Sequence, residues 1–360
     1  MLSSFFQKYH ITPNDTLIIA CSGGPDSMYL LLESMKSHDP KHLVVAHFNH
    51  SLRGIESDED EIFLREFCMK HSLVFESEKK DIAKIAESLK KSIEETARIE
   101  RYAFLERVRE KYSQKSPEKQ GNVHEDCVSK GGVLKSTMKP FSSPSEPETC
   151  KIGMESSRFA EIFILTAHHL DDSIETFMFH LIRGTKIQGL TGVPEQNGHI
   201  LRPLLSIQKK EILQSLDRDS ISYRLDSTNA DDAYLRNHLR LNIVSQFERI
   251  NPEYRKNLGA FMEYAKEVAS FIETQVEIFL RGETSFSVED FQVLSPFMQR
   301  EVFRYLYARA NNGTIGLSEG AIAEMIRFTQ DKGNYTRKDL GKLHLEKRNF
   351  RVYSAIIISS

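Results

Sequence analysis

Short apolar runs that alternate with helical patterns constrain the first half of this chain more than any other feature. Residues 16–21 (TLIIAC), 43–48 (LVVAHF) and 161–166 (EIFILT) have the length and composition of buried strands. A helical spacing of apolar residues follows each run, as in residues 171–183 after the third. Because strands that alternate with helices build βαβ units, the sequence predicts an α/β domain with a mainly parallel sheet.

The patterning changes twice further along the chain. Residues 113–157 are rich in Ser, Pro, Gly, Lys and Glu without any period, which predicts a low-complexity insertion in the first domain. Helical patterns dominate from residue 204 onward. We therefore expect a first domain over residues 1–250 and a smaller, mostly helical domain over residues 251–360, which ends in a small hairpin.

Composition excludes several classes of protein. With 360 residues, 40% of them hydrophobic, and a formal net charge of −3, the chain is an ordinary globular protein and not an obvious nucleic-acid binder. Its four cysteines form no CxxC pair, which argues against zinc ribbons and iron–sulfur sites and suits a reducing cytosol. The N-terminus has no signal-peptide pattern, and no apolar run approaches the roughly 20 residues of a membrane helix. We expect a cytoplasmic protein without a membrane partner.

The first apolar run leads into a loop and then a helix. The loop consists of Ser22, Gly23, Gly24, Pro25, Asp26 and Ser27. Two glycines let the main chain approach an anion closely, and backbone N–H groups at a helix start favour phosphate. The two serines add hydroxyl groups, and Asp26 is a candidate for holding Mg²⁺ or fixing the loop. A simple capped turn is the alternative, but the order strand–loop–helix favours phosphate binding.

No lysine follows these glycines, so the loop is not the GxxxxGK[ST] loop that grips a transferred γ-phosphate. It resembles instead the PP-loop of the ATP pyrophosphatase superfamily, whose members cut ATP between the α and β phosphates. The resemblance implies ATP as co-substrate. It also implies a doubly wound, adenine nucleotide α-hydrolase-like fold for the first domain.

Further motifs narrow this resemblance. In chain order they are His47-Phe48-Asn49-His50-Ser51-Leu52-Arg53-Gly54, Glu95-Thr96-Ala97-Arg98, Arg101-Tyr102, His168-His169-Leu170-Asp171-Asp172, Glu175-Thr176, Arg202-Pro203-Leu204-Leu205 and Arg236-Asn237-His238-Leu239-Arg240. Together they resemble the tRNA(Ile)-lysidine synthetases over about residues 16–112 and 160–250. The insertion departs from the family, in which a short turn usually joins this helix and strand.

The resemblance implies an AMP-forming carbon–nitrogen ligase that acts on tRNA with ATP, Mg²⁺ and free L-lysine. The C2 oxygen of the wobble cytidine in a CAU anticodon is adenylated, and pyrophosphate leaves. The ε-amine of lysine then attacks C2 and expels AMP. The product, lysidine, pairs with A instead of G, so the tRNA reads AUA rather than AUG and its identity changes from Met to Ile.

Four residues outside the loop are candidates for the reaction. Asp172 and Glu175 lie three apart, so on a helix they share a face that could grip a lysine ammonium or Mg²⁺. A helix start that carries acids because of its dipole is the alternative. The resemblance places His168, Arg101 and these two acids around the lysine and the reacting phosphate, where Arg101 would offset charge on the α-phosphate. Two adjacent histidines without a third ligand nearby argue against a catalytic zinc.

Two basic groups are candidates for RNA contacts. Arg236, Asn237 and Arg240 share a helical face and either contact phosphates or pair with acids of the first domain. The C-terminal segment 332–351 carries Lys332, Arg337, Lys338, Lys342, Lys347, Arg348 and Arg351, with Tyr335 and Phe350 interleaved. It predicts a surface for the tRNA backbone, although a solvated basic edge is the alternative. Association of two copies is left open.

Two other functions compete with this prediction. One is another PP-loop ligase, either a tRNA thiolase, although thiolases usually need cysteine pairs, or an amide-forming enzyme of small metabolites. The second is a nucleotide-binding module without turnover. It would leave the acidic face at Asp172 and Glu175 and the basic Arg101 unexplained.

Overall fold

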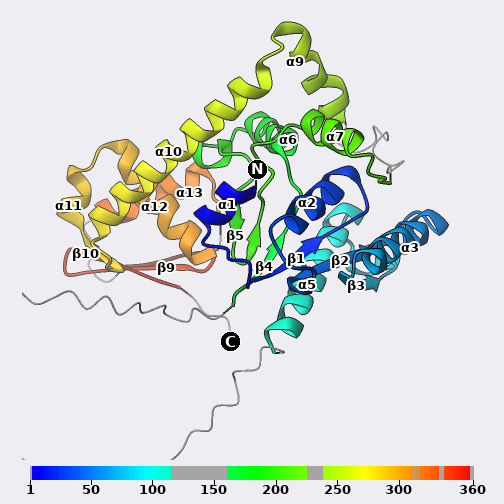
Figure 1. The fold of residues 1–360 in the computed structure, drawn as a ribbon. Coiled ribbons are helices and arrows are strands. Elements are labelled where there is room, and N and C mark those ends of the chain that lie inside the picture. The colour runs from blue at the N-terminus through cyan, green and yellow to red at the C-terminus, as the bar shows by residue number, and fades with distance from the viewer. Residues whose placement is uncertain are drawn as a thin grey trace, which may run out of the picture. The chain divides into compact units, whose positions relative to one another are not determined.

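The computed structural model describes residues 2–114, 160–224, 238–311, 313–314, 316–331 and 336–356. The chain forms two compact units (Figure 1), one made of Met1–Leu170 with Pro194–Asn229 and the other of Asp171–Val193 with Ala230–Ser360. Nearly all of the predicted insertion lies outside the described residues.

A six-stranded sheet forms the centre of the first unit. Its spatial order is β3 (Val74–Lys79), β2 (Leu43–Asn49), β1 (Thr16–Ala20), β4 (Ile162–Leu165), β6 (Ile200–Leu201) and β5 (Gln196–Asn197). All neighbours pair in parallel except β5, which is antiparallel to β6. The predicted mainly parallel sheet is confirmed. The chain moves from β1 to β2 on one side and later returns to β4 on the other, so β1 is the point where the direction of winding reverses.

Helices cover both faces of this sheet. They are α1 (Leu2–Lys8), α2 (Pro25–Met35), the 3-10 turn η1 (Pro40–His42), α3 (Ile55–Lys70), α4 (Ile82–Leu89), α5 (Ile93–Ser113) and α7 (Lys209–Arg218). Successive residues of a strand point to opposite faces. Leu17 and Ile19 accordingly pack with α1, α2, α3 and α7, whereas Ile18 packs with α4 and α5. All three side chains are fully buried, which is why β1 is an uninterrupted apolar run.

The second unit combines helices with a small sheet. Its helical elements are α6 (Leu170–Ile182), which begins at the last residue of the first unit's long segment, η2 (Ile187–Leu190), the π-helical turn η4 (Leu239–Val244), α9 (Ser245–Ile250), α10 (Tyr254–Leu280), α11 (Val288–Val293), α12 (Pro296–Asn311) and α13 (Glu319–Gln330). The antiparallel sheet has the order β7 (Ser285–Ser287), β10 (Arg351–Ile356), β9 (Leu343–Arg348) and β8 (Thr336–Leu340). The predicted terminal hairpin is its β9–β10 pair. The two outer strands, β7 and β8, are short or polar, so their sequences show no clear strand pattern.

The second unit begins earlier in the chain than the expected boundary near residue 251. Segment Asp171–Val193 and the chain from Ala230 both belong to it. The cause is packing between segments far apart in sequence, since α10 packs against η2, and the rings of Phe177 and Phe261 lie 5.7 Å apart between centroids. The helix after β4 therefore gives its apolar side to the second unit. Within the described ranges, no helix is both long and apolar enough to cross a bilayer.

Replacement of Phe291 by Ala should lower the free energy of unfolding by about 3–5 kcal/mol, because the ring is fully buried and its removal leaves a cavity. Phe271→Ala is the matched control on α10, where the ring is 64% exposed, and should cost less than about 0.5 kcal/mol. Urea unfolding followed by circular dichroism measures both. Equal losses would contradict the placement of Phe291 in the core.

Candidate functional site

The loop between β1 and α2 has the backbone that phosphate binding requires. Gly23 has a φ of +85°, which L side chains rarely adopt, and Gly24 is the extended residue that precedes α2. Gly24, not Asp26 or Ser27, is the N-cap, and no side chain caps the helix. The hydroxyl of Ser27 donates to the Gly24 carbonyl at 3.0 Å and accepts from the N–H of Ser22 at 3.2 Å. The loop is therefore held by its own serines, while the uncapped N-terminus of α2 suits an anion.

A chain of ion pairs ties the loop to α3. The carbonyl of Gly23 accepts from the backbone N–H of Arg224 at 2.9 Å. The Arg224 guanidinium lies 2.9 Å from Asp60 and 2.7 Å from Glu59, and Arg53 also reaches Asp60 at 2.6 Å. Because Asp60 is almost fully buried, its two guanidinium partners compensate the loss of water around its charge.

Asp26, the acid of the loop, is paired with a lysine that no sequence motif indicates. Lys209 is the first residue of α7, and its Nζ lies 2.5 Å from Asp26 Oδ1. His169 Nε2 lies 3.7 Å from the same oxygen. The lysine is 183 residues away in sequence, so no local motif could have revealed it.

Arginines surround His168. Arg98 and Arg101 lie with their guanidinium carbons 5.3 and 5.5 Å from the ring centre of Tyr102 on α5. Arg202, which is 3% exposed, donates from Nη1 to the carbonyl of Pro194 at 2.7 Å. We call Arg98, Arg101 and Arg202 the arginine cluster. Among the residues that the structure describes, no carboxylate forms an ion pair with any of the three.

Burial and the charges of the arginine cluster together shift the pKa values of the neighbouring side chains. Burial, followed by the charges of Arg202, Arg101 and Arg98, lowers the pKa of His168 to about 3. Burial, partly opposed by Tyr102, lowers the pKa of the Arg101 guanidinium. Burial alone would raise the pKa of Tyr102, but the surrounding guanidinium groups outweigh it and lower that pKa. A neutral imidazole among excess positive charges forms a site that favours an anion.

Two buried polar atoms at this place add to the same conclusion. The Tyr102 hydroxyl lies beside the Arg101 and Arg202 guanidinium groups, and neither it nor Arg202 Nε has a hydrogen bond of normal geometry within the described ranges. Buried polar groups normally have partners, so an exception next to unpaired charges points to a ligand. Imidazole Nδ1 of His168 instead lies 3.0 Å from the hydroxyl of Thr166.

The two predicted lysine-binding acids lie on α6 in the second unit. Both are half-buried, and Glu175 Oε1 lies 3.9 Å from Arg240 Nε. Their neighbour Asp171 is paired with Arg255 at 2.7 Å. Arg240 thus lies next to an acid of the second unit, and which of its two predicted roles applies stays a prediction. Arg236 and Asn237 lie outside the described residues. Because Arg101, His168 and the loop belong to the first unit, a site shared with Asp172 and Glu175 stays a prediction.

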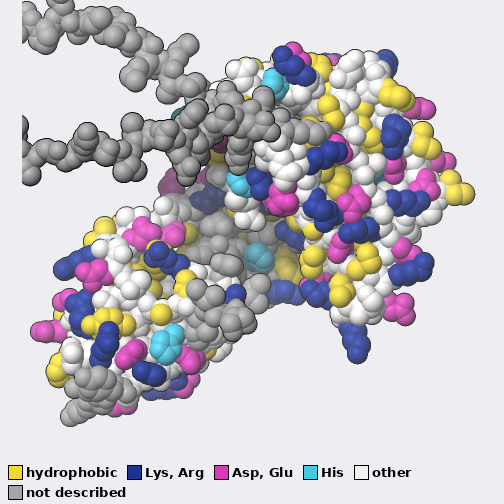
Figure 2. Space-filling view, turned by 90° about the horizontal axis from the view of Figure 1, so that it is seen from below, with side chains coloured by type: hydrophobic (Ala, Val, Ile, Leu, Met, Phe, Trp, Pro, Cys, Tyr) yellow, Lys and Arg dark blue, Asp and Glu magenta, His cyan; other side chains and the backbone are white. Residues whose placement is uncertain are grey.

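The basic C-terminal segment is partly used within its own unit. Lys347 is buried and donates to the carbonyls of Thr329, at 2.9 Å, and Asp331. Among the described lysines and arginines of the segment, Lys338 pairs with Glu324 and Arg351 with Glu283, while Lys332 lies outside the described residues. On the face shown in Figure 2, basic and acidic side chains are interspersed without an extended area of one sign. The tRNA-binding surface stays a prediction, carried by fewer residues than the sequence suggested.

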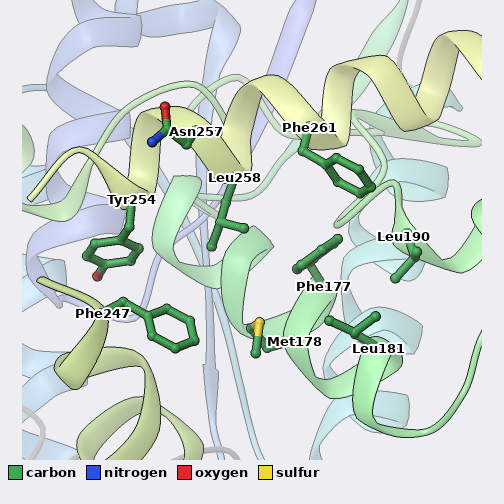
Figure 3. Close-up of a pocket in the computed structure, with 9 residues that line it drawn as sticks. All are labelled: Phe177, Met178, Leu181, Leu190, Phe247, Tyr254, Asn257, Leu258 and Phe261. Carbon is green, nitrogen blue, oxygen red and sulfur yellow. The ribbon is translucent and has the colours of Figure 1, made fainter. Parts of the chain in front are cut away.

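An apolar pocket of about 440 Å³ in the second unit is a different kind of site. Figure 3 shows side chains of α6 facing those of α10 across it. It is lined by Phe177, Met178, Leu181, Leu190, Phe247, Tyr254, Asn257, Leu258 and Phe261. None of these is charged, so the pocket does not suit phosphate or an ammonium group.

The described residues offer few ligands for a metal ion such as Mg²⁺. Within the described part of the chain, no group of three or more His, Cys, Asp or Glu side chains is placed to hold a metal ion. Mg²⁺ commonly uses one or two carboxylates together with substrate phosphates and water. Asp26, on the phosphate loop and partly exposed, fits that requirement as a single carboxylate.

The fold and the loop define a PP-loop domain, and the family model described by that name, ATP_bind_3, matches residues 2–115 and 155–247. The chain is 32% identical over 267 residues to the tRNA(Ile)-lysidine synthase of Bacteroides thetaiotaomicron, covering 74% of this chain and 51% of that protein. It is 30% identical over 313 residues to the synthase of Chlorobaculum tepidum, covering 84% and 80%. The chain thus belongs to the PP-loop family and, within it, to the tRNA(Ile)-lysidine synthase family. This confirms the resemblance predicted from the motifs.

Two further comparisons describe the extent of the likeness. The chain spans about half the length of two of its curated relatives, 51% of the Bacteroides protein and 48% of the Parabacteroides distasonis synthase. Among solved structures, the U34-tRNA thiolase NcsA from Methanococcus maripaludis, with its 4Fe–4S cluster, matches with a TM-score of 0.47 and 17% identity over 71% of this chain and 73% of that one.

Gly23→Ala should destabilise the protein by about 1–2 kcal/mol, because a Cβ has space at this position but the φ of +85° is strained for an L residue. Gly24→Ala is the matched control, since its backbone is extended and its Cβ would meet Ser22 Oγ at an ordinary 3.4 Å. Urea unfolding without nucleotide compares the two. A loss for Gly24→Ala as large as for Gly23→Ala would contradict the backbone argument.

The lowered pKa of His168 predicts a loss of stability in acid. Between its ordinary value of 6.5 and its folded value of about 3, the unfolded chain takes up a proton that the folded chain refuses. The contribution of His168 to the free energy of unfolding is therefore constant above pH 6.5 and falls as the pH drops toward 3. His168→Gln should make the decline shallower, as measured by urea midpoints between pH 7 and pH 4. Parallel declines in both proteins would show that His168 is not held neutral.

Proposed function

We propose that this protein is an ATP-dependent tRNA(Ile)-lysidine synthetase, which joins free L-lysine to C2 of the wobble cytidine in a CAU anticodon and releases AMP and pyrophosphate. The observation that supports it best is the pairing of two anion sites in the first unit. The loop follows β1 and the His168 segment follows β4, and these strands are adjacent and parallel. Their carboxyl ends lie at the edge where α/β sheets bind ligands, on the side where winding reverses.

The two sites would bind different phosphates of ATP, as cleavage between the α and β phosphates requires. The loop and the N-terminus of α2 would bind the β and γ phosphates, with Asp26 as the carboxylate for Mg²⁺. Mg²⁺, when bound, would neutralise charge on the departing pyrophosphate. Arg101, supported by Arg98 and Arg202, would stabilise the negative charge that develops on the α-phosphate when the cytidine oxygen attacks it.

His168 would act in the second step. Lysine is an ammonium ion in solution and must lose a proton before its nitrogen can attack C2. Burial is the largest cause of the low pKa of His168, and the guanidinium charges add to it; an anionic phosphate within the arginine cluster would offset the part due to those charges and so raise the proton affinity of the neutral imidazole. Asp172 and Glu175 on α6 would hold the lysine by its positive charge.

The partners of the reaction complete the proposal. Arg337, Lys342 and Arg348, which make no ion pair to a carboxylate within the described residues, would carry the tRNA-backbone contacts of the C-terminal segment. A cytoplasmic location is part of the proposal because tRNA, ATP and free lysine meet there.

The direct test supplies ATP, labelled lysine and an isoleucine tRNA with a CAU anticodon, and measures pyrophosphate and label in RNA. Incorporation that requires all three substrates supports the proposal. Pyrophosphate without incorporation would identify a different PP-loop ligase, and absence of turnover would favour a nucleotide-binding module.

Asp172→Asn should raise the lysine concentration at half-saturation about tenfold to hundredfold, the usual effect of losing a hydrogen bond to a charged group. The half-saturating ATP concentration should change by less than about twofold. The adjacent Asp171→Asn is the matched control, because Asp171 is paired with Arg255 and should affect stability rather than lysine dependence. Unchanged lysine dependence in Asp172→Asn would remove Asp172 from the lysine site.

A further inference from the structure

The phosphate loop contains no lysine, yet the structure places a lysine against it. Lys209 Nζ lies 2.5 Å from the Asp26 carboxylate, and its side chain remains one-third exposed. We propose that Lys209 is a pyrophosphate-binding residue, supplied by α7 rather than by the loop itself. This inference rests on the proposed cleavage of ATP between its α and β phosphates.

The backbone around Lys209 is fixed relative to α2, the helix that begins at the loop. Ile212 and Leu216 on α7 are almost fully buried in the same core cluster as Met28 and Leu31 on α2. Just before α7, the carbonyl of Ile207 accepts from the N–H of Leu170 at 2.9 Å. The lysine ammonium is thus held at the N-terminal end of α2, where backbone N–H groups would receive the phosphates.

Charge explains why a cation is needed there. Asp26 is an acid on a loop that must hold a highly charged anion, so an unpaired Asp26 would repel it. In the nucleotide-free protein Lys209 neutralises Asp26. Asp26 would hold Mg²⁺ when the metal binds with the nucleotide, and the Lys209 ammonium would then be available to bind phosphate oxygens at the loop. A point charge with three donors on a flexible stem is suited to that change of partner.

The competing explanation is that Lys209 only holds Asp26 in place. In that case its loss would disturb every ligand of the loop region, and the disturbance would depend on the Asp26 carboxylate. A pyrophosphate contact predicts instead a selective loss that persists when Asp26 is replaced by Asn. The neighbouring Lys210 is exposed and provides a matched control of equal charge on the same helix turn.

The test measures binding of pyrophosphate with Mg²⁺, and of AMP, to the full chain by titration calorimetry. Lys209→Met should weaken pyrophosphate binding about tenfold to hundredfold and change AMP binding by less than about twofold. Lys209→Arg should keep most of the affinity, and Lys210→Met should leave it unchanged. The selective loss should recur when Lys209→Met is added to Asp26→Asn. Circular dichroism confirms folding, and Lys209→Gln replaces Lys209→Met if the latter does not fold.

Equal weakening of pyrophosphate and AMP, or an effect of Lys209→Met that disappears beside Asp26→Asn, would overturn the inference. So would unchanged pyrophosphate affinity. The titration needs neither tRNA nor lysine, so it is separate from the proposed function. Wild-type protein that binds pyrophosphate through Lys209 but makes no lysidine would reject the function and keep the inference.

Discussion

Complete burial of β1 is the constraint on which the first unit depends. Leu17 and Ile19 pack on one face of the sheet and Ile18 on the other, and none of the three is exposed. A central strand of this kind must leave the core at its carboxyl end, and here it does so through Gly23, whose φ is +85°. The loop that follows therefore emerges beside β4, the strand that leads to His168. Because both faces of β1 are buried, the burial of this strand determines where the candidate phosphate loop lies and which backbone conformation it adopts.

Charges at the end of β4 are arranged differently from those around the phosphate loop. Beside the loop, buried charge is compensated by ion pairs, as in the network of Asp60 with Arg53 and Arg224. In the arginine cluster, three guanidinium groups lie near Tyr102 and His168. No carboxylate pairs with these groups within the described residues. Perturbed protonation without an internal partner is a recognised mark of functional sites. The same residues are those that the family motifs contain.

Local features were predictable from the sequence. The apolar run of β1, the glycines after it and the helical character of the chain from residue 204 onward can be recognised in short windows of residues, and the structure confirms them. Long-range features were not. Lys209 approaches Asp26 only because α7 packs on α2, and no spacing rule joins residues 183 positions apart. The lysine and arginine residues of the C-terminal segment look alike in sequence, yet Lys347 is buried against backbone carbonyls. The division of the chain likewise follows from packing of α10 on η2, which periodicity cannot show.

The unpaired arginine cluster has a cost for the free protein. Burial lowers the pKa of Arg101, and the charge of Arg98 adds to this effect, so the like charges of the cluster repel each other in a partly dry environment. A bound anion removes this repulsion, so the folded state gains stability when the site is filled. The cluster is therefore preorganised for its ligand at the expense of the empty protein's stability, a trade-off typical of sites shaped by function rather than by folding.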